Sequence, residues 1–382
     1  MTEWRECKLK ELADFNPDSL TAKSKLQFIN YLDTGNITKG KIDKIQYFNL
    51  LTDKVPSRAK RIVKKNDIIY SAVRPNQEHY GIIKNPVENM VVSTGFVVLR
   101  AKEDKCYSDF LYYFLTLPEN TEYLSNVAED STTAYPSITP DIIMDMDISL
   151  PPLPEQIAIA EVLSSLDDKI DLLTRQNKTL EDLAQAYFRK WFIEDASDEW
   201  EVGKLGDYIE IHDSKRVPLS KIEREKMKSG TLYPYYGAAT IMDYVNDYIF
   251  DGEYILMGED GTVETEDGYP VLQYATGKFW VNNHAHVLTA KSPFNNYFIW
   301  FFLKQCNISG IVTGAVQPKI NQENLKNIDI PIPDLTLINS ANQFFANIFA
   351  KILNNLEQIK TFQKLRDTLL PKLISGEIRV KM

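Results

Sequence analysis

The chain repeats itself, and this duplication limits its possible folds more than any other feature of the sequence. The segment Trp4–Lys10 matches Trp200–Gly206, and the aromatic segment Phe110–Leu115 matches Phe298–Leu303. Two further pairs of matching segments follow in the same order along the chain. Thr133–Thr139 matches Ala315–Asn321, and Asp147–Leu153 matches Asp329–Leu335. The offset between partners falls from about 196 to about 182 residues, as expected when the middle of a repeat varies more than its edges. The 382 residues therefore consist of two copies of one unit.

Each copy begins with a region of mixed secondary structure. Short apolar runs bounded by Gly, Asn or Asp predict strands at Asp67–Val73, Val91–Leu99 and Glu253–Met257. The segments Phe110–Leu115 and Tyr297–Leu303 predict helices beside them. The fold class predicted for both copies is therefore α+β, or mixed α/β.

Each copy then continues into a long helix. A proline-rich turn, Pro151–Pro154 or Pro331–Pro333, is followed by a long stretch without Pro or Gly. The apolar positions of both stretches alternate at spacings of three and four, which is typical of a coiled-coil seam. From Glu155 to Phe192 such a helix would be about 57 Å long. The predicted seam comprises Leu163, Leu166, Ile170, Leu173, Asn177, Leu180, Tyr187 and Trp191 in the first copy, and Phe345, Ile348, Ile352, Asn355, Ile359, Phe362, Leu369 and Leu373 in the second.

The two stripes favour packing on each other in antiparallel fashion about a pseudo-two-fold axis. Asn177, Asn355 and Arg366 interrupt the apolar pattern, as polar seam residues do when they set register at some cost in stability. The core of an ordinary helical bundle would show a similar stripe, and this alternative stays open.

Composition excludes several classes of protein. Three cysteines at wide spacing, Cys7, Cys106 and Cys306, argue against a disulfide framework. The longest apolar run, Tyr297–Leu303, is far shorter than the roughly 20 residues of a membrane span. The N-terminus shows no signal-peptide pattern, so we expect a cytoplasmic protein that does not enter a membrane.

The net charge of −10 counts against a nucleic-acid partner, but the charge is unevenly distributed. Residues 151–199 hold 5 basic and 11 acidic side chains, whereas basic stripes persist on both sides of that segment.

Several of these segments resemble a known family. Ser131–Ile138, followed by Ile148–Leu163, is similar to the end of a target-recognition domain and the helix after it in the specificity subunits of type I restriction-modification systems. Further segments that resemble this family are Ser71–Pro75, Ser93–Arg100, Tyr233–Ala238, Tyr248–Leu256 and Leu370–Arg379. The similarity covers nearly the whole chain. One departure is Ala239-Thr240, where the family often continues with Asn/Thr-Gly.

The resemblance implies a sequence-specific DNA-recognition subunit without catalytic activity of its own. It implies target-recognition domains at residues 1–150 and 196–333, a first spacer helix at 151–195, and a second spacer helix with the C-terminal tail at 334–382. Each domain would read one half of an asymmetric, bipartite DNA site. The implied partners are double-stranded DNA, two methyltransferase subunits and motor-nuclease subunits. Adenine-N6 methylation and cleavage would then belong to the complex, and S-adenosylmethionine, ATP and Mg would bind only to the partner subunits.

Within this interpretation, the basic stripes predict contacts to DNA phosphates, although a solvated charged face would give the same pattern. The phosphate candidates are Lys54, Arg58, Lys60, Arg61, Lys64 and Lys65 in the first copy, and Lys215, Arg216, Lys221 and Lys228 in the second.

Base readout needs side chains that can pair with base edges, chiefly Arg with guanine and Asn or Gln with adenine. The candidates after the strand near Ser71 are Arg74, Asn76, Gln77 and His79, and a plain polar turn is the alternative. In the second copy the candidates are Tyr233, Tyr235 and Tyr236, for which packing in the core is the alternative.

Motifs for catalysis are missing. His284-Ala-His286 lacks companion ligands at the spacing of a zinc site, so no metal is expected. The single Pro-Pro pair, Pro151-Pro152, follows Leu150 rather than the Asn/Asp of an amino-methyltransferase motif. The alternative function is a non-catalytic scaffold that binds protein or carbohydrate, which the acidic net charge favours. A self-sufficient enzyme is disfavoured.

Overall fold

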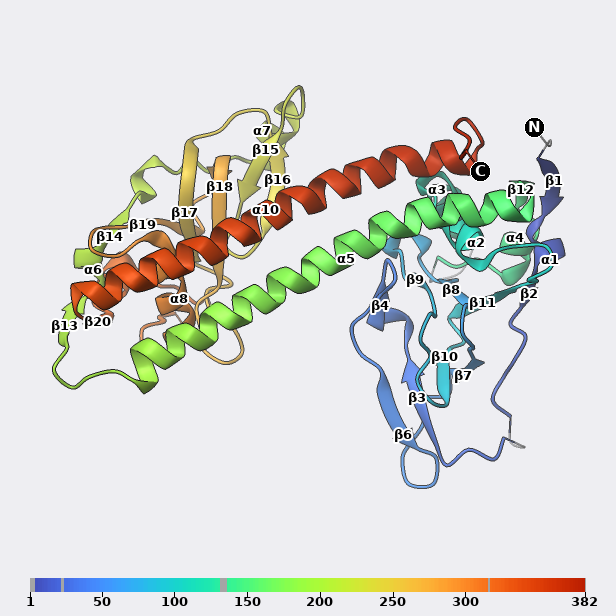
Figure 1. Ribbon diagram of the computed structural model, residues 1–382, viewed down its shortest axis with the longest axis horizontal. Helices are drawn as coiled ribbons and strands as arrows, with labels where there is room; N and C mark the ends of the chain where they lie inside the picture. The colour runs from blue at the N-terminus through green and yellow to red at the C-terminus, as the bar shows by residue number, and fades with distance from the viewer. Residues whose placement is uncertain (1–3, 22–23, 131–135, 315–316, 382) are drawn as a thin grey trace. The chain divides into compact units, whose positions relative to one another are not determined.

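The computed structural model describes residues 4–21, 24–130, 136–314 and 317–381 (Figure 1). The repeat residues 133–135 and 315–316 lie outside this description. The chain divides into two compact units. Unit 1 comprises Met1–Leu172 and Gln358–Met382, and unit 2 comprises Leu173–Glu357. Each unit thus combines one of the two mixed regions with part of each long helix.

Unit 1 is built on two four-stranded sheets with the orders β2-β11-β8-β9 and β6-β3-β10-β7, and on the two-stranded pair β1-β12. The fully buried residues Leu9, Leu99 and Phe110 bring α1, β11 and α2 into one core. The elements are β1 Arg5–Lys8, α1 Leu9–Leu12, β2 Ala13–Phe15, β3 Phe28–Leu32, β4 Ile37–Thr38, β5 Lys41–Ile42, β6 Gln46–Asn49, β7 Ala59–Ile62, β8 Ile68–Ser71, β9 Tyr80–Ile82, β10 Met90–Ser93, β11 Phe96–Ala101, α2 Ser108–Leu115, α3 Pro118–Glu129, α4 Pro140–Met144 and β12 Asp147–Leu150.

Unit 2 contains one six-stranded sheet of order β14-β19-β17-β18-β15-β16 and the two-stranded pair β13-β20. Leu205, Leu288 and Phe298 are fully buried in its core, at places that correspond to those in unit 1. The elements are β13 Glu201–Lys204, α6 Leu205–Tyr208, β14 Ile209–Ile211, α7 Lys221–Lys226, β15 Tyr233–Tyr236, β16 Ile241–Val245, β17 Phe250–Gly258, β18 Leu272–Val281, β19 Ala285–Ala290, α8 Asn296–Gln305, α9 Gln322–Lys326 and β20 Asp329–Ile332.

Strand register confirms the duplication predicted from the sequence. Arg5 lies opposite Leu150 in the antiparallel pair β1-β12, and Glu201 lies opposite Ile332 in β13-β20. These are the offsets of about 196 and about 182 residues found in the sequence itself. The two units differ in their sheets, since unit 1 has two four-stranded sheets and unit 2 has one six-stranded sheet.

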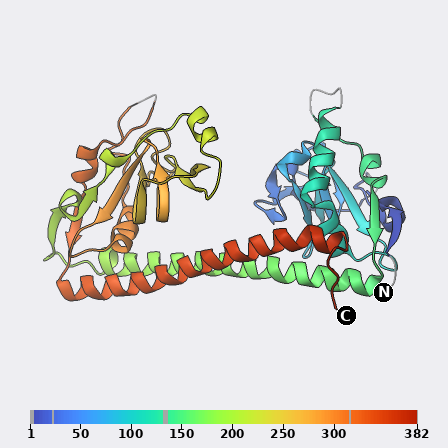
Figure 2. The ribbon, with the colours of Figure 1, turned by 90° about the horizontal axis from the view of Figure 1, so that it is seen from above.

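The two long helices are α5, Leu153–Arg189, which ends in a π-helical turn at Lys190–Glu194, and α10, Leu335–Ile374. In unit 1, Asp167 of α5 bonds to Arg366 of α10. Glu155, which comes earlier in α5, bonds to Arg379, which follows the end of α10. In unit 2, Asn177 bonds to Asn355. The helices are therefore antiparallel, as predicted, and in each unit the sheets lie on one side of them (Figure 2).

Most predicted seam positions are buried or half-buried. In unit 2 the side chain of Asn355 is fully buried, and its Nδ2 donates to Asn177 Oδ1 over 2.8 Å. Tyr187 is 40% exposed, whereas its neighbour Phe188 is buried against Phe298 and Phe345. The buried stripe therefore shifts by one position at the end of α5, because α5 packs there on the domain core as well as on α10.

Asp167 belongs to an acidic stretch of α5 but is bonded within unit 1. It accepts hydrogen bonds from Tyr113 Oη and Arg366 Nη1, both over 2.8 Å. The partners come from α2 and α10, which the local sequence does not reveal. Among the described residues, no helix is both long enough and apolar enough to cross a membrane.

Candidate nucleic-acid interface

A rigid turn follows β8 in unit 1. Arg74 and Glu78 adopt left-handed backbone conformations, with φ of 47° and 55°, on either side of the 3₁₀ turn Pro75–Gln77. The ring of Pro75 is buried, and the Arg74 N–H donates to the carbonyl of Pro136 over 3.0 Å. Left-handed conformations cost about 1 kcal/mol or more for residues with a Cβ, so they persist only where surrounding contacts hold them.

This turn exposes the side chains of Arg74, Asn76 and Gln77. These are three of the predicted base-readout residues, and a fixed backbone holds them together. His79 differs, because it is half-buried and its Nδ1 lies 2.6 Å from the carbonyl oxygen of Ile37. The turn can therefore offer one guanidinium and two amides to base edges.

The basic run of unit 1 separates into two groups. Lys54, Arg58, Lys60 and Lys65 are exposed, and no ion pair within the described part of the chain engages them. Such cations can pair with phosphates without breaking an existing contact.

The other two cations of this run are engaged. Lys64 pairs with Asp18 over 3.0 Å, and the half-buried Arg61 donates from Nε to the carbonyl of Phe96 over 3.1 Å. Burial lowers the pKa of Arg61. Both residues contribute to packing inside the unit.

In unit 2, Lys215 and Lys221 are exposed, whereas Arg216 points inward. The Arg216 side chain is only 11% exposed, and its Nη1 lies 2.5 Å from Glu259 Oε2 and 2.6 Å from the carbonyl oxygen of Ala285. Arg216 is therefore not available as an exposed cation, because its guanidinium neutralises the Glu259 carboxylate within unit 2. Sequence reasoning missed this partner, which lies 43 residues away.

Lys228 pairs with Asp243, which Arg224 also contacts over 2.9 Å. The hydrogen bond from Lys228, together with that from Arg224, lowers the pKa of Asp243 to about 2. This carboxylate therefore stays ionised at neutral pH and holds both cations at the edge of β16.

A buried polar network surrounds His286 in unit 2. His286 is fully buried, its Nδ1 lies 2.6 Å from Asp213 Oδ2, and its Nε2 lies 2.9 Å from the carbonyl oxygen of Ile320. Burial raises the pKa of Asp213, but bonds from His286 and the Val287 N–H and the charge of Arg216 outweigh burial and lower it overall.

Asp213, Glu259 and His286 bring possible metal-ligand atoms within 4.8 Å of one another. Arg216 contacts both carboxylates, and Lys319 Nζ lies 3.3 Å from Glu259 Oε1. These two cations already supply positive charge to the cluster. The other histidine of the pair, His284, bonds to Asp260.

The three candidate tyrosines of unit 2 have different surroundings. Tyr235 is buried, and its Oη accepts from the backbone N–H of Leu219 over 2.9 Å. Tyr236 is half-buried and packs edge-on against Phe279. Tyr233 contacts Tyr248 near Lys278, so of the three it is the one best suited to a ligand at the surface.

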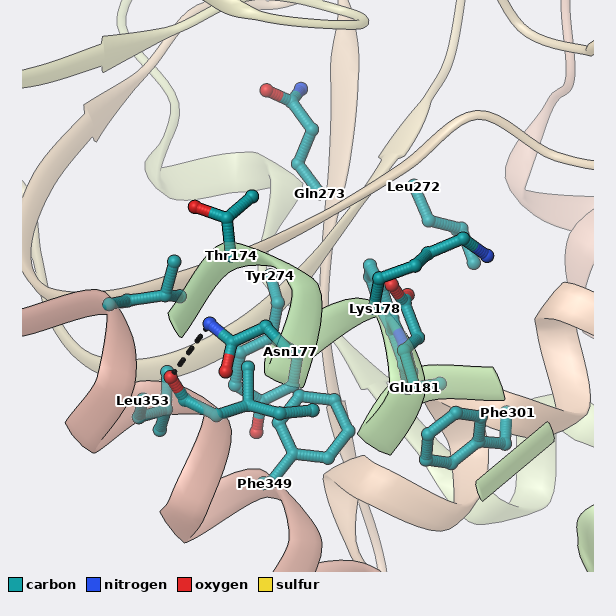
Figure 3. A pocket seen from close by; sticks show the side chains of 13 residues that line it. Thr174, Asn177, Lys178, Glu181, Leu272, Gln273, Tyr274, Phe301, Phe349 and Leu353 are labelled. Atoms are coloured by element: carbon teal, nitrogen blue, oxygen red, sulfur yellow. Dashed lines mark hydrogen bonds between the residues drawn. The ribbon is translucent and has the colours of Figure 1, made fainter. Parts of the chain in front are cut away.

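Unit 2 also holds a cavity of about 400 Å³ between α5, α10, α8 and β18 (Figure 3). Asn177 and Tyr274 line it together with the apolar side chains of Phe349 and Leu353. Asn177 Nδ2 donates weakly to the Ile352 carbonyl over 3.4 Å. The cavity lies beside the helix seam and contains none of the predicted DNA contacts.

Comparison with known proteins agrees with the duplicated architecture. Residues 1–182 and 197–368 each match the family model described as the type I restriction modification DNA specificity domain. The HindI specificity subunit of Haemophilus influenzae is 34% identical over 229 residues, which cover 58% of this chain and 48% of that relative. The MjaIX specificity subunit of Methanocaldococcus jannaschii is 28% identical over 372 residues, which cover 87% of this chain and 82% of that relative.

A solved structure shares the fold. The type I restriction-modification S subunit from M. genitalium superimposes with a TM-score of 0.60 at 17% sequence identity. The match covers 99% of this chain and 96% of that chain.

Proposed function

This chain belongs to the type I restriction-modification DNA specificity family, and from that premise we propose that it reads a bipartite, asymmetric DNA site. One observation carries the proposal: the two specificity-domain matches coincide with two copies of one fold whose variable parts differ. Two unlike reading surfaces should recognise two unlike half-sites.

The reading surface proposed for unit 1 is the turn that exposes Arg74, Asn76 and Gln77, with Lys54, Arg58 and Lys60 as phosphate contacts. For unit 2 the surface includes Tyr233 and the exposed cations Lys215 and Lys221. The proposed domain ranges are 1–150 and 196–333, joined by spacer segments 151–195 and 334–382.

The chain would act in the cytoplasm as the non-catalytic member of a larger complex. Its partners would be two methyltransferase subunits, which carry S-adenosylmethionine, and motor-nuclease subunits, which carry ATP and Mg. Adenine methylation and DNA cleavage would be activities of that complex.

Exchange of residues 1–150 for the corresponding domain of another specificity subunit tests the proposal. The hybrid chain is expressed with its methyltransferase partner, and methylated adenines are sequenced in the host genome. One half-site should change while the other half-site stays the same. A change in both halves, or in neither, contradicts the assignment of one half-site to each unit.

A further inference from the structure

The two units share a set of surface charges that their folds place at equivalent positions. Equivalence follows from strand register and from backbone bonds such as Lys102 N to Leu12 O and Lys291 N to Tyr208 O. The matched pairs, with the unit 1 residue first, are Lys8 and Lys204, Glu11 and Asp207, Asp14 and Glu210, Lys102 and Lys291, and Asp147 and Asp329. We call these two sets charged patch 1 and charged patch 2.

The repeated charges include the same ion pair with the same additional bond. Lys8 Nζ lies 3.0 Å from Asp147 Oδ1 and 2.7 Å from the carbonyl oxygen of Asp145. Lys204 Nζ lies 2.5 Å from Asp329 Oδ1 and 3.2 Å from the carbonyl oxygen of Asn327.

The repeated ion pair contributes too little to folding stability to explain why it occurs in both units. The side chains of the pair are 39% and 77% exposed in unit 1, and 53% and 67% exposed in unit 2. Ion pairs at such exposure contribute about 0–1 kcal/mol. Two neighbouring charges are not repeated, since Lys10 corresponds to Gly206 and Arg5 to Glu201.

Charged patch 2 surrounds a hollow of about 480 Å³, lined by Lys204, Asp207, Glu210, Lys291 and Lys326 among others. In each patch the repeated ion pair lies on a strand pair that leads directly into a long helix, since β12 ends at Leu150 before α5 and β20 ends at Ile332 before α10 (Figure 1). Both patches therefore lie on parts of the fold that the two units have in common, and charged patch 2 is also hollowed.

Both patches contain acidic as well as basic groups, so the surface would repel phosphates as much as attract them. A protein face of complementary mixed charge suits it better. Because the same surface occurs twice, it would accept the same partner twice.

We propose that charged patches 1 and 2 dock two copies of one protein partner, one copy on each unit. The proposal rests on the proposed function, in which that partner is the methyltransferase subunit. The partner face presents acidic groups to Lys204 and Lys291 and a basic group to Asp207 and Glu210, with the corresponding arrangement at unit 1.

Exchange of charges within the repeated ion pair tests the proposal. The double variant Lys204→Asp/Asp329→Lys keeps an ion pair inside the chain but reverses the pattern that a partner meets. Lys8→Asp/Asp147→Lys does the same in unit 1. Native mass spectrometry of the full chain mixed with the methyltransferase subunit should show two bound copies for the unaltered chain, one copy for either exchange, and none for both together. The affinity at an altered patch should fall at least tenfold.

The matched control is Lys190→Asp/Asp195→Lys, an exposed ion pair outside both patches, which should keep two copies. The single variant Lys204→Asp separates docking from folding. If the single variant loses a copy while the charge exchange regains it, the pair is structural and the proposal is wrong. Two copies on the doubly exchanged chain also overturn it but leave the proposed function intact. An unaltered chain that binds no methyltransferase subunit contradicts the proposed function itself.

Discussion

At the scale of single residues, the surroundings decide what a cation does. Arg216 and Lys60 both belong to basic stretches, yet Arg216 neutralises Glu259 inside unit 2 while Lys60 stays exposed. A buried guanidinium is tolerated only when it is paired, and the pairing makes it unavailable to a phosphate. Lys54, Arg58 and Lys60 combine exposure with the lack of an ion-pair partner among the described residues.

Replacement of Lys54, Arg58 and Lys60 by Gln should weaken DNA binding and reduce its dependence on salt. Each phosphate contact that is lost should lower the log–log slope of affinity against salt by about one. Binding of the assembled complex to a target duplex, measured by fluorescence anisotropy between low and moderate salt, checks this expectation.

Lys178→Gln serves as the control, because Lys178 already pairs with Asp182 on α5. Its slope should equal that of the unaltered complex. A flat salt response of the unaltered complex would favour the alternative scaffold function over DNA recognition.

At the scale of elements, the C-terminal tail bonds to the beginning of α5 within unit 1. Glu155 is 2% exposed, and it accepts from Arg379 Nη2 over 2.6 Å and from Trp4 Nε1 over 3.2 Å. The Arg379 guanidinium also lies over the ring of Trp4. Three parts of the chain that are distant in sequence therefore meet at one buried carboxylate.

Arg379→Ala should lower the free energy of unfolding by about 3 kcal/mol, because it leaves the Glu155 carboxylate buried without its cation. The double variant Glu155→Leu/Arg379→Met should regain most of this loss, since it removes both charges. Chemical denaturation followed by circular dichroism measures both. Lys372→Ala, which breaks an exposed pair with Glu377, should cost less than 1 kcal/mol. Equal losses in Arg379→Ala and Lys372→Ala would show that the buried pair has no special role.

At the scale of the whole molecule, two units share two continuous helices, and each unit holds its own helix pairing. Unit 1 contains the Asp167–Arg366 pair and unit 2 the Asn177–Asn355 pair. An insertion in α5 alone would make the stretch of α5 between these two pairs longer than the matching stretch of α10. A change of spacer therefore needs matched insertions in α5 and α10.

Seven residues inserted after Leu172 and seven after Glu357 should preserve the spacing of the seam and both sets of pairs. Seven helical residues add about 10 Å, which corresponds to about three base pairs of DNA. Methylation sequencing should find unchanged half-sites separated by a longer spacer. The same insertion in α5 alone should reduce assembly or methylation, and an unchanged spacer with both insertions would count against the helices as the ruler.

Local patterns in the sequence predicted the larger features correctly. The duplication, the antiparallel helices and the polar seam positions Asn177 and Asn355 are visible because repeats and heptad spacing are carried by neighbouring residues. The same reasoning left core packing as an alternative for all three tyrosines without singling out Tyr235, and it could not predict that Asp167 bonds to Tyr113. Those outcomes depend on partners from other elements.

What the sequence alone determined about this protein is its two-copy plan and the pairing of its long helices. Only the tertiary structure decided which cations stay free, which turn presents Arg74, and that Asp213, Glu259 and His286 meet in one buried network. Asp213 and His286 are 73 residues apart in the chain and 2.6 Å apart in space. Periodicity acts over one or two turns of a helix, whereas burial and charge pairing are settled only when distant strands come together.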